Sequence, residues 1–157
     1  MKDVEISYTF TVPRDEIEAH LTPQSIVEYQ GTFDVRSVEE TPDGWELTVE
    51  SERMGPDSRS VLVCTETERG YRYVQKSGGV FEQLQTEVAV DEGEPTRVTV
   101  RSSFTFGGPL AFAKDWFAAR WRRKELERFM MNLARELEAS GAVDPEDTDG
   151  FESGSDS

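Results

Sequence analysis

Apolar and polar residues alternate strictly in the first segment of the chain. In residues 4–12 every even position is apolar and every odd position is polar, which is the period of a strand with one buried face. Pro13 ends this strand and opens a short helix, which Thr22-Pro23 interrupts. Residues 25–29 then form a second short helix capped by Ser25. The chain therefore begins with a strand and two short helices.

After Gly31 the pattern changes to that of strands joined by short turns. Turn residues such as Thr41-Pro42-Asp43-Gly44 and Glu92-Gly93-Glu94-Pro95 separate the runs. Strands connected by such short turns form an antiparallel meander. The predicted strands cover residues 33–40, 45–49, 59–66, 71–76, 80–91 and 98–106.

A long amphipathic helix follows the strands. Residues 110–139 contain no glycine or proline and would span roughly 45 Å as one helix. One face carries Leu126, Phe129, Met130, Leu133 and Leu137, and the same face projected backward passes through Phe112, Trp116, Ala119 and Arg123. A sheet with one apolar face needs a cover, and this helix is the only element large enough. We therefore expect a curved, six- to seven-stranded antiparallel sheet wrapped around it.

The end of the chain has a different composition. Residues 142–157 contain six acidic residues, no basic ones and much serine and glycine, which predicts disorder. The expected organisation is one α+β domain over residues 1–140 and an acidic disordered tail over 141–157.

Charge and rare residues exclude several classes of protein. The net charge of -15 argues against binding nucleic acid. The single cysteine rules out an internal disulfide and a cysteine-based zinc cluster. The single histidine leaves one candidate for any histidine-based site, and nothing points to a metal or a cofactor. No apolar run is long enough to cross a membrane and no signal-peptide core is visible, so we expect a cytoplasmic protein. Only four of the 17 basic residues are lysine, and this acidic, lysine-poor composition favours an organism with a high-salt cytosol over the alternative of an ordinary acidic protein with an acidic tail.

The order of these elements resembles the SRPBCC superfamily. This is the helix-grip fold of START domains, birch-pollen-allergen-like proteins and polyketide cyclases/dehydrases. The resemblance covers about residues 3–139. It rests on the first strand running into a helix at residues 10–17, the unbroken strand series, and Gly107-Gly108-Pro109-Leu110 leading into the long helix. Similarity to this superfamily implies a hydrophobic ligand bound between helix and sheet, or cyclase-type chemistry there.

A cavity is expected where the first half of the long helix crosses the sheet. Alanines in this half leave room that leucines would fill. The alternative is that the facing residues simply pack as core. The expected ligand-binding residues are Ile26, Tyr29, Leu47, Val49, Val63, Tyr73, Leu84, Thr86, Val100, Ser102, Phe104, Phe112, Trp116, Ala119 and Arg123.

The chemistry-bearing residues around this cavity are few. Glu28, Tyr29 and Arg123 are weak catalytic candidates, and His20 would need a carboxylate partner such as Glu28. The arginines near residue 123 form either an anion site or, as the favoured alternative, ion pairs with acids such as Glu125.

The sequence favours binding or transport of a lipid, isoprenoid or polyketide-like molecule. Two alternatives remain: a polyketide cyclase/dehydrase-type enzyme and a protein-interaction module with a filled core. Phe117 and Trp121 lie four residues apart, opposite Leu126. They would be buried under the loop at residues 54–58 or form a homodimer contact.

Overall fold

A computed structural model describes residues 2–52, 55–78, 83–93, 95–105, 111–139 and 152–153. The strands are β1 (Lys2–Phe10), β2 (Asp34–Thr41), β3 (Gly44–Glu50), β4 (Ser60–Glu66), β5 (Gly70–Gly78), β6 (Gln83–Val90), β7 (Thr96–Thr105) and β8 (Glu152–Ser153). The helices are α1 (Arg14–Ala19), α2 (Pro23–Tyr29), the 3-10 turn η1 (Pro56–Ser58) and α3 (Ala111–Ala139).

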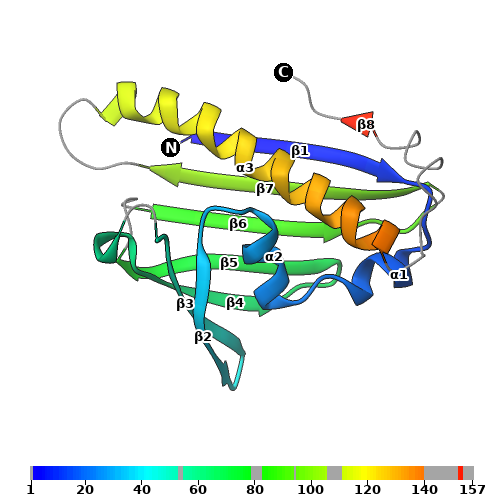
Figure 1. Cartoon of the computed structure of the whole chain (residues 1–157), viewed down its shortest axis with the longest axis horizontal. Helices are drawn as coiled ribbons and strands as arrows, with labels where there is room; N and C mark the ends of the chain where they lie inside the picture. The colour runs from blue at the N-terminus through cyan, green and yellow to red at the C-terminus, as the bar shows by residue number, and fades with distance from the viewer. Residues whose placement is uncertain are drawn as a thin grey trace.

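All the strands belong to one antiparallel sheet, in the order β2-β3-β4-β5-β6-β7-β1-β8. The first strand therefore closes the meander by pairing with β7, with Ile6 opposite Val100. The helix α3 lies across one face of this curved sheet, and α1 and α2 lie on the same side (Figure 1). This confirms the predicted α+β helix-grip architecture.

The two short helices differ slightly from the prediction. The helix α2 begins two residues earlier than expected, and Thr22 is its N-cap. The Thr22 hydroxyl accepts a hydrogen bond from the Ser25 amide at 3.0 Å, and the Ser25 hydroxyl accepts one from the Thr22 amide at 2.8 Å. Ser25 therefore completes a capping box from inside the helix and is not the cap itself.

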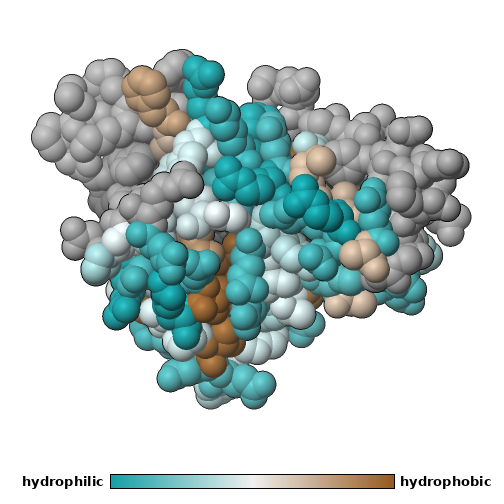
Figure 2. Space-filling model, in the orientation of Figure 1, coloured by the Kyte–Doolittle hydropathy of each residue, from teal (hydrophilic) through white to brown (hydrophobic). Residues whose placement is uncertain are grey.

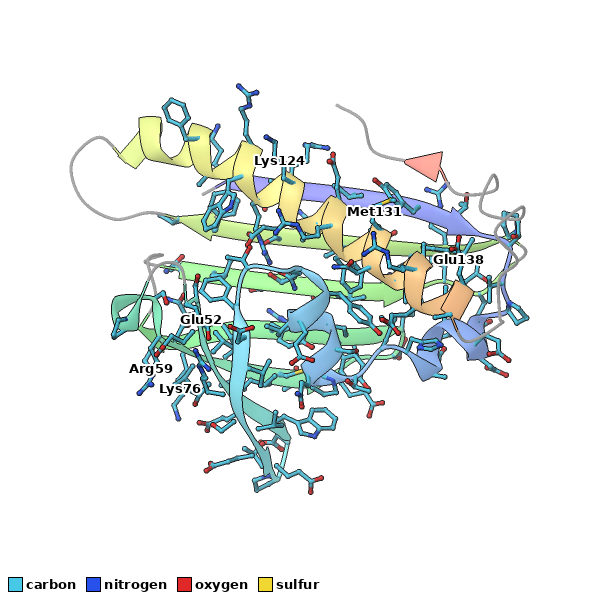
Figure 3. All side chains as sticks on the ribbon, in the orientation of Figure 1. Glu52, Arg59, Lys76, Lys124, Met131 and Glu138 are labelled. Carbon is cyan, nitrogen blue, oxygen red and sulfur yellow. The ribbon has the colours of Figure 1, made fainter. Side chains whose placement is uncertain are left out.

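The core lies between α3 and the concave face of the sheet. From α3 it takes the five residues whose spacing predicts a buried face, and all five are fully buried: Leu126, Phe129, Met130, Leu133 and Leu137. Opposite them lie alternate residues of the strands, such as Ile6 of β1 and Val100 of β7. Lys124, Met131 and Glu138 mark the outer side of the helix (Figure 3).

The predicted tail lies largely outside the described residues. Glu152 and Ser153 are the exception, because they pair with Thr9 and Tyr8 of β1 as the two-residue strand β8. Disorder over 141–157 remains a prediction for the rest of this segment.

Candidate functional site: an apolar pocket with a buried arginine

A small pocket lies between the end of α2, four strands of the sheet and α3. Its volume is about 40 Å³, room for about two or three water molecules. Most of its wall is apolar, and its polar groups come from serine, threonine, glutamine, tyrosine and one arginine. The lining residues are Val27, Gln30, Phe33, Val49, Ser60, Leu62, Tyr73, Gln75, Leu84, Thr86 and Arg122.

The turn after α2 brings Gln30 and Phe33 to the pocket. Gly31 has a positive φ of 81°, which lets the chain reverse directly after the helix. A Cβ atom at this position would collide with the side chain of Arg128 on α3. Arg128 also donates a hydrogen bond to the carbonyl of Gln30 at 3.3 Å, and Asn132 donates one to the carbonyl of Tyr29 at 2.7 Å. These contacts fix the end of α2 against α3, with Gln30 in the pocket wall.

Arg122 is the centre of a buried polar cluster at the pocket. It is only 5% exposed. Its Nε donates to Ser102 Oγ at 3.0 Å and its Nη2 donates to Thr86 Oγ1 at 2.9 Å. Its Nη1 donates to Gln30 Oε1 at 2.5 Å and to Glu125 Oε1 at 3.0 Å. The guanidinium is thus held by β6, β7, the C-cap residue of α2 and the neighbouring turn of α3.

Glu125 balances the charge of this arginine. The two side chains form an ion pair within α3 and are 6% and 2% exposed. The second carboxylate oxygen, Oε2, has no hydrogen-bond partner among the described residues. Such a pair adds little to stability, because both charges lose their hydration. The pair therefore places a buried, internally balanced charge beside the pocket.

Ser60 contributes a second polar group that the fold does not use. It is 5% exposed, and its hydroxyl has no hydrogen-bond partner among the described residues. It lies opposite Val49 in the β3–β4 pairing, so it faces the pocket beside an apolar neighbour. A buried hydroxyl without a partner costs about 1–3 kcal/mol, which a ligand atom could offset.

Tyr73 and Cys64 lie side by side on the same face of the sheet. The Tyr73 hydroxyl donates a hydrogen bond to the carbonyl of Pro23 at 2.6 Å, which ties β5 to the start of α2. Burial raises the pKa of Tyr73 well above its ordinary value. Burial also raises the pKa of the Cys64 thiol, to about 11. Both groups stay protonated at neutral pH, so neither is a general base.

The structure brings some of the predicted ligand-binding residues to the pocket and places others elsewhere. Val49, Tyr73, Leu84 and Thr86 line it, and Ser102 reaches it through Arg122. Packed in the core, away from the pocket wall, are Ile26, Leu47, Val100 and Phe104. Val63 alternates with the inward-facing Leu62 and Cys64, so it faces the other side of the sheet.

On α3 and at the end of α2 the inward-facing residues are each one position away from the prediction. On α3 the buried pair is Ala118 and Arg122, whereas Ala119 and Arg123 are only partly buried. The pocket wall includes Val27 of α2 and its C-cap Gln30, not Ile26 and Tyr29. The side chains of Phe112 and Trp116 lie outside the described residues.

Sequence reasoning missed Val27, Gln30, Phe33, Ser60, Leu62, Gln75 and Arg122. One signal was available for Arg122, because this residue lies four positions before Leu126 and seven before Phe129 on the same helical face. The favoured pairing of the helix arginines with acids is confirmed for Arg122 and Glu125.

The catalytic candidates do not meet in the pocket. Glu28 is exposed and accepts a hydrogen bond from Gln24 at 3.3 Å. Tyr29 packs against Phe129, with ring centroids 6.1 Å apart, and burial raises its pKa. His20 is the C-cap of α1, where its carbonyl accepts from the Ser25 hydroxyl at 2.8 Å. No group of three metal-ligating side chains is found in the described part of the chain.

Phe117 and Trp121 differ in how far their side chains are exposed. Phe117 is 67% exposed, whereas Trp121 is partly buried and packs against the core. The expectation that both are buried under the loop at residues 54–58 is therefore wrong for Phe117, and residue 54 lies outside the described residues. A homodimer contact at Phe117 remains a prediction.

The surface over β2 is partly apolar. Val38 of β2 is 40% exposed. Figure 2 shows a strip of hydrophobic surface over this part of the molecule, bordered by hydrophilic residues. None of the described helices is long and apolar enough to cross a lipid bilayer.

No protein-family model matches the chain. No curated protein matches it either. Any relationship must therefore be sought in the three-dimensional structure.

Solved structures with the same arrangement cover nearly all of the chain. A protein from Thermus thermophilus is 16% identical, with a TM-score of 0.69 over 88% of this chain and 99% of that one. The Zhui aromatase/cyclase from a Streptomyces species is 14% identical, with a TM-score of 0.64 over 90% of this chain and 99% of that one. A START superfamily protein from Mycobacterium smegmatis is 13% identical, with a TM-score of 0.55 over 88% of this chain and 95% of that one.

These similarities define the class of fold. The chain has the helix-grip α+β fold that START superfamily and aromatase/cyclase proteins share. Identities this low show the fold alone, so the function must be argued from the pocket.

Proposed function

We propose that the chain binds a small amphipathic molecule in the pocket between α2, α3 and the sheet. The observation that carries this proposal is the combination of an apolar wall with polar groups that the fold leaves available. Ser60 offers an unpartnered hydroxyl, and Arg122 is held in the wall by Gln30 and Thr86. A molecule with an apolar body and an oxygen-bearing head group complements both features.

Apolar burial would supply most of the affinity. Contact with Val27, Leu62 and Leu84 removes hydrocarbon from water, at about 0.8 kcal/mol for each buried CH₂. The empty space of about 40 Å³ is small. The ligand must therefore be compact, or only one ring or chain segment of it enters, with side-chain movement making further room. Lipids, isoprenoids and polyketide-like aromatics all supply such a segment.

An aromatase/cyclase-type enzyme using the same pocket is the second candidate. Fold similarity to the Zhui aromatase/cyclase supports it. However, Glu28 and Tyr29 lie outside the pocket wall, and Tyr73 is a protonated donor already bonded to Pro23. The described residues offer no general base in the pocket, so binding or transport is favoured over catalysis.

We further propose that the chain works in a high-salt cytosol. Its net charge of -15 and its low lysine content support this environment.

Extraction of the purified chain with organic solvent, followed by mass spectrometry, tests the proposal. We expect a co-purified compound with an apolar body and a polar oxygen. Ser60→Val provides the matched control, because it removes the hydroxyl and fills the space with a residue suited to a strand. Its extract should contain at least about tenfold less of the compound.

Thermal unfolding supplies the second measurement. A compound added at 100 times its Kd stabilises the folded chain by about 2.7 kcal/mol. For a chain of this size that raises Tm by about 5–10 °C. Extracts that are repeatedly empty, with no Tm shift from lipids, isoprenoids or aromatics, would contradict the proposed function.

A further inference from the structure

We propose that the Arg122–Glu125 pair makes the pocket selective for uncharged head groups over carboxylates and other anions. The favoured head groups are ketone, amide and hydroxyl oxygens. This inference rests on the proposed function, because it specifies which amphipathic molecules the pocket accepts.

An arginine in the wall of an apolar pocket ordinarily attracts an anion. Here the charge is already balanced inside the protein. Glu125 Oε1 lies 3.0 Å from Arg122 Nη1, and the two side chains are 6% and 2% exposed. Of the described residues that line the pocket, Arg122 is the only charged one. A ligand carboxylate would therefore add a second buried negative charge with one cation to share, and this charge would lose its hydration.

The pocket still offers hydrogen-bond donors to a ligand that carries no charge. The guanidinium has five N–H groups, and Ser102, Gln30, Glu125 and Thr86 accept from four of them. These four bonds leave one Nη2 hydrogen unused. The Ser60 hydroxyl, which is also unpartnered there, can donate or accept. These groups suit a neutral oxygen, which accepts a hydrogen bond but brings no charge.

The unpartnered Oε2 atom of Glu125 strengthens the argument. If both oxygens of a carboxylate accept hydrogen bonds, its negative charge is largely compensated. Oε2 is buried and has no partner in the described chain, so this part of the carboxylate's negative charge is not hydrogen-bonded and adds repulsion toward a nearby anion. Glu125 thus acts as a specificity-determining residue that works through Arg122 and does not touch the ligand.

Two probes with the same ring system test this inference: 2-acetylnaphthalene and 2-naphthoate. Their head groups have the same number of heavy atoms and differ in charge. Kd values are measured for the full chain by NMR titration at pH 7 and about 1 M KCl, where the exposed charges of the chain are screened and the buried pair is screened much less. We expect the wild-type chain to bind the ketone at least about tenfold more tightly than the carboxylate, which corresponds to about 1.4 kcal/mol.

Glu125→Gln provides the decisive variant. It keeps the shape of the side chain and an acceptor oxygen but leaves the charge of Arg122 unbalanced. We expect it to bind 2-naphthoate at least about tenfold more tightly than the wild-type chain does, with little change for the ketone. Glu127→Gln is the matched control, because it removes the same charge from an exposed position on the same helix. This control should leave the ratio of the two Kd values unchanged.

The outcomes separate the two proposals. A wild-type chain that binds the carboxylate as tightly as the ketone overturns the selectivity and leaves the proposed function standing. The same conclusion follows if Glu125→Gln folds and gains no affinity for the carboxylate. If neither compound binds either protein, the proposed function fails and the selectivity fails with it. Should Glu125→Gln not fold, the wild-type ratio alone decides.

Discussion

Two buried serines, Ser58 and Ser60, lie on either side of Arg59 and differ in their hydrogen bonding. The Ser58 hydroxyl accepts from the Ser51 amide at 2.9 Å and donates to the Gly55 carbonyl at 2.6 Å. The Ser60 hydroxyl has no partner in the described part of the chain. The first hydroxyl therefore stabilises a loop, whereas the second costs stability unless a ligand uses it.

Replacing each serine with alanine separates these roles. Ser60→Ala should raise the free energy of unfolding by about 1 kcal/mol, because an unpartnered buried hydroxyl disappears. Ser58→Ala should lower it by about 1 kcal/mol, because bonded groups lose their partner. Urea denaturation of the ligand-free chain measures both. A Ser60→Ala variant as destabilised as Ser58→Ala would show that the Ser60 hydroxyl has a structural partner.

The thiol of Cys64 carries a pH dependence that can be isolated. Burial raises its pKa from 9.0 to about 11. Between these values the folded chain keeps the proton while the unfolded chain releases it, so stability is full below pH 9 and falls as the pH rises.

We expect this thiol to cost the folded chain about 1 kcal/mol for each pH unit between pH 9 and pH 11. The tyrosines also titrate in this range, so the Cys64→Ala variant supplies the comparison. Urea denaturation of both proteins at pH 8, 9 and 10 checks the prediction. A difference in stability between the two proteins that stays constant over these pH values would contradict the raised pKa.

At the scale of the elements, α3 organises both the core and the pocket. Its C-terminal half supplies the buried apolar face from Leu126 to Leu137, and one turn earlier the same face supplies Arg122. The end of α2 is held to α3 by Asn132 and Arg128. The position of the pocket therefore depends on how firmly α3 packs on the sheet.

A leucine and a methionine of similar size, on opposite sides of α3, test this dependence. Leu133 is fully buried and Met131 is 50% exposed. Leu133→Ala should lower the free energy of unfolding by about 2–5 kcal/mol, because it leaves a cavity in the core. Met131→Ala should change it by less than about 0.5 kcal/mol. Equal effects in thermal or urea unfolding would show that α3 is not packed as described.

Most elements of the fold could be predicted from the sequence, because alternation and helical spacing are strong over long segments. The site could be predicted only in part. Helical projection from Leu126 led to Arg123, one residue from the buried Arg122, because the spacing cannot show that an arginine enters the core with its own counter-charge. In β4 the run from Val61 to Cys64 is apolar at every position, so only strand pairing decides that Leu62 faces inward and Val63 outward.

At the scale of the whole molecule, the net charge of -15 is the dominant feature. Exposed acids repel one another at low ionic strength, and this repulsion opposes the compact state. At 1 M salt the screening length falls to about 3 Å, which removes most of it.

We therefore expect the urea midpoint of unfolding to rise when KCl is increased from about 0.1 M to about 2 M. The gain should be largest over roughly the first 1 M, where screening changes most. Circular dichroism at a series of KCl concentrations measures it. A midpoint that is independent of KCl, or that falls, would contradict both the repulsion argument and the proposed high-salt environment.

If the pocket beside Arg122 binds a small amphipathic molecule, a ligand should perturb the residues that line it. The decisive measurement is an NMR titration of the isotope-labelled chain with 2-acetylnaphthalene. We expect saturable shifts gathered at Val27, Gln30, Ser60, Thr86 and the Nε–H of Arg122. Shifts that never saturate, or that gather around the exposed Phe117 and leave the pocket signals unmoved, would contradict it.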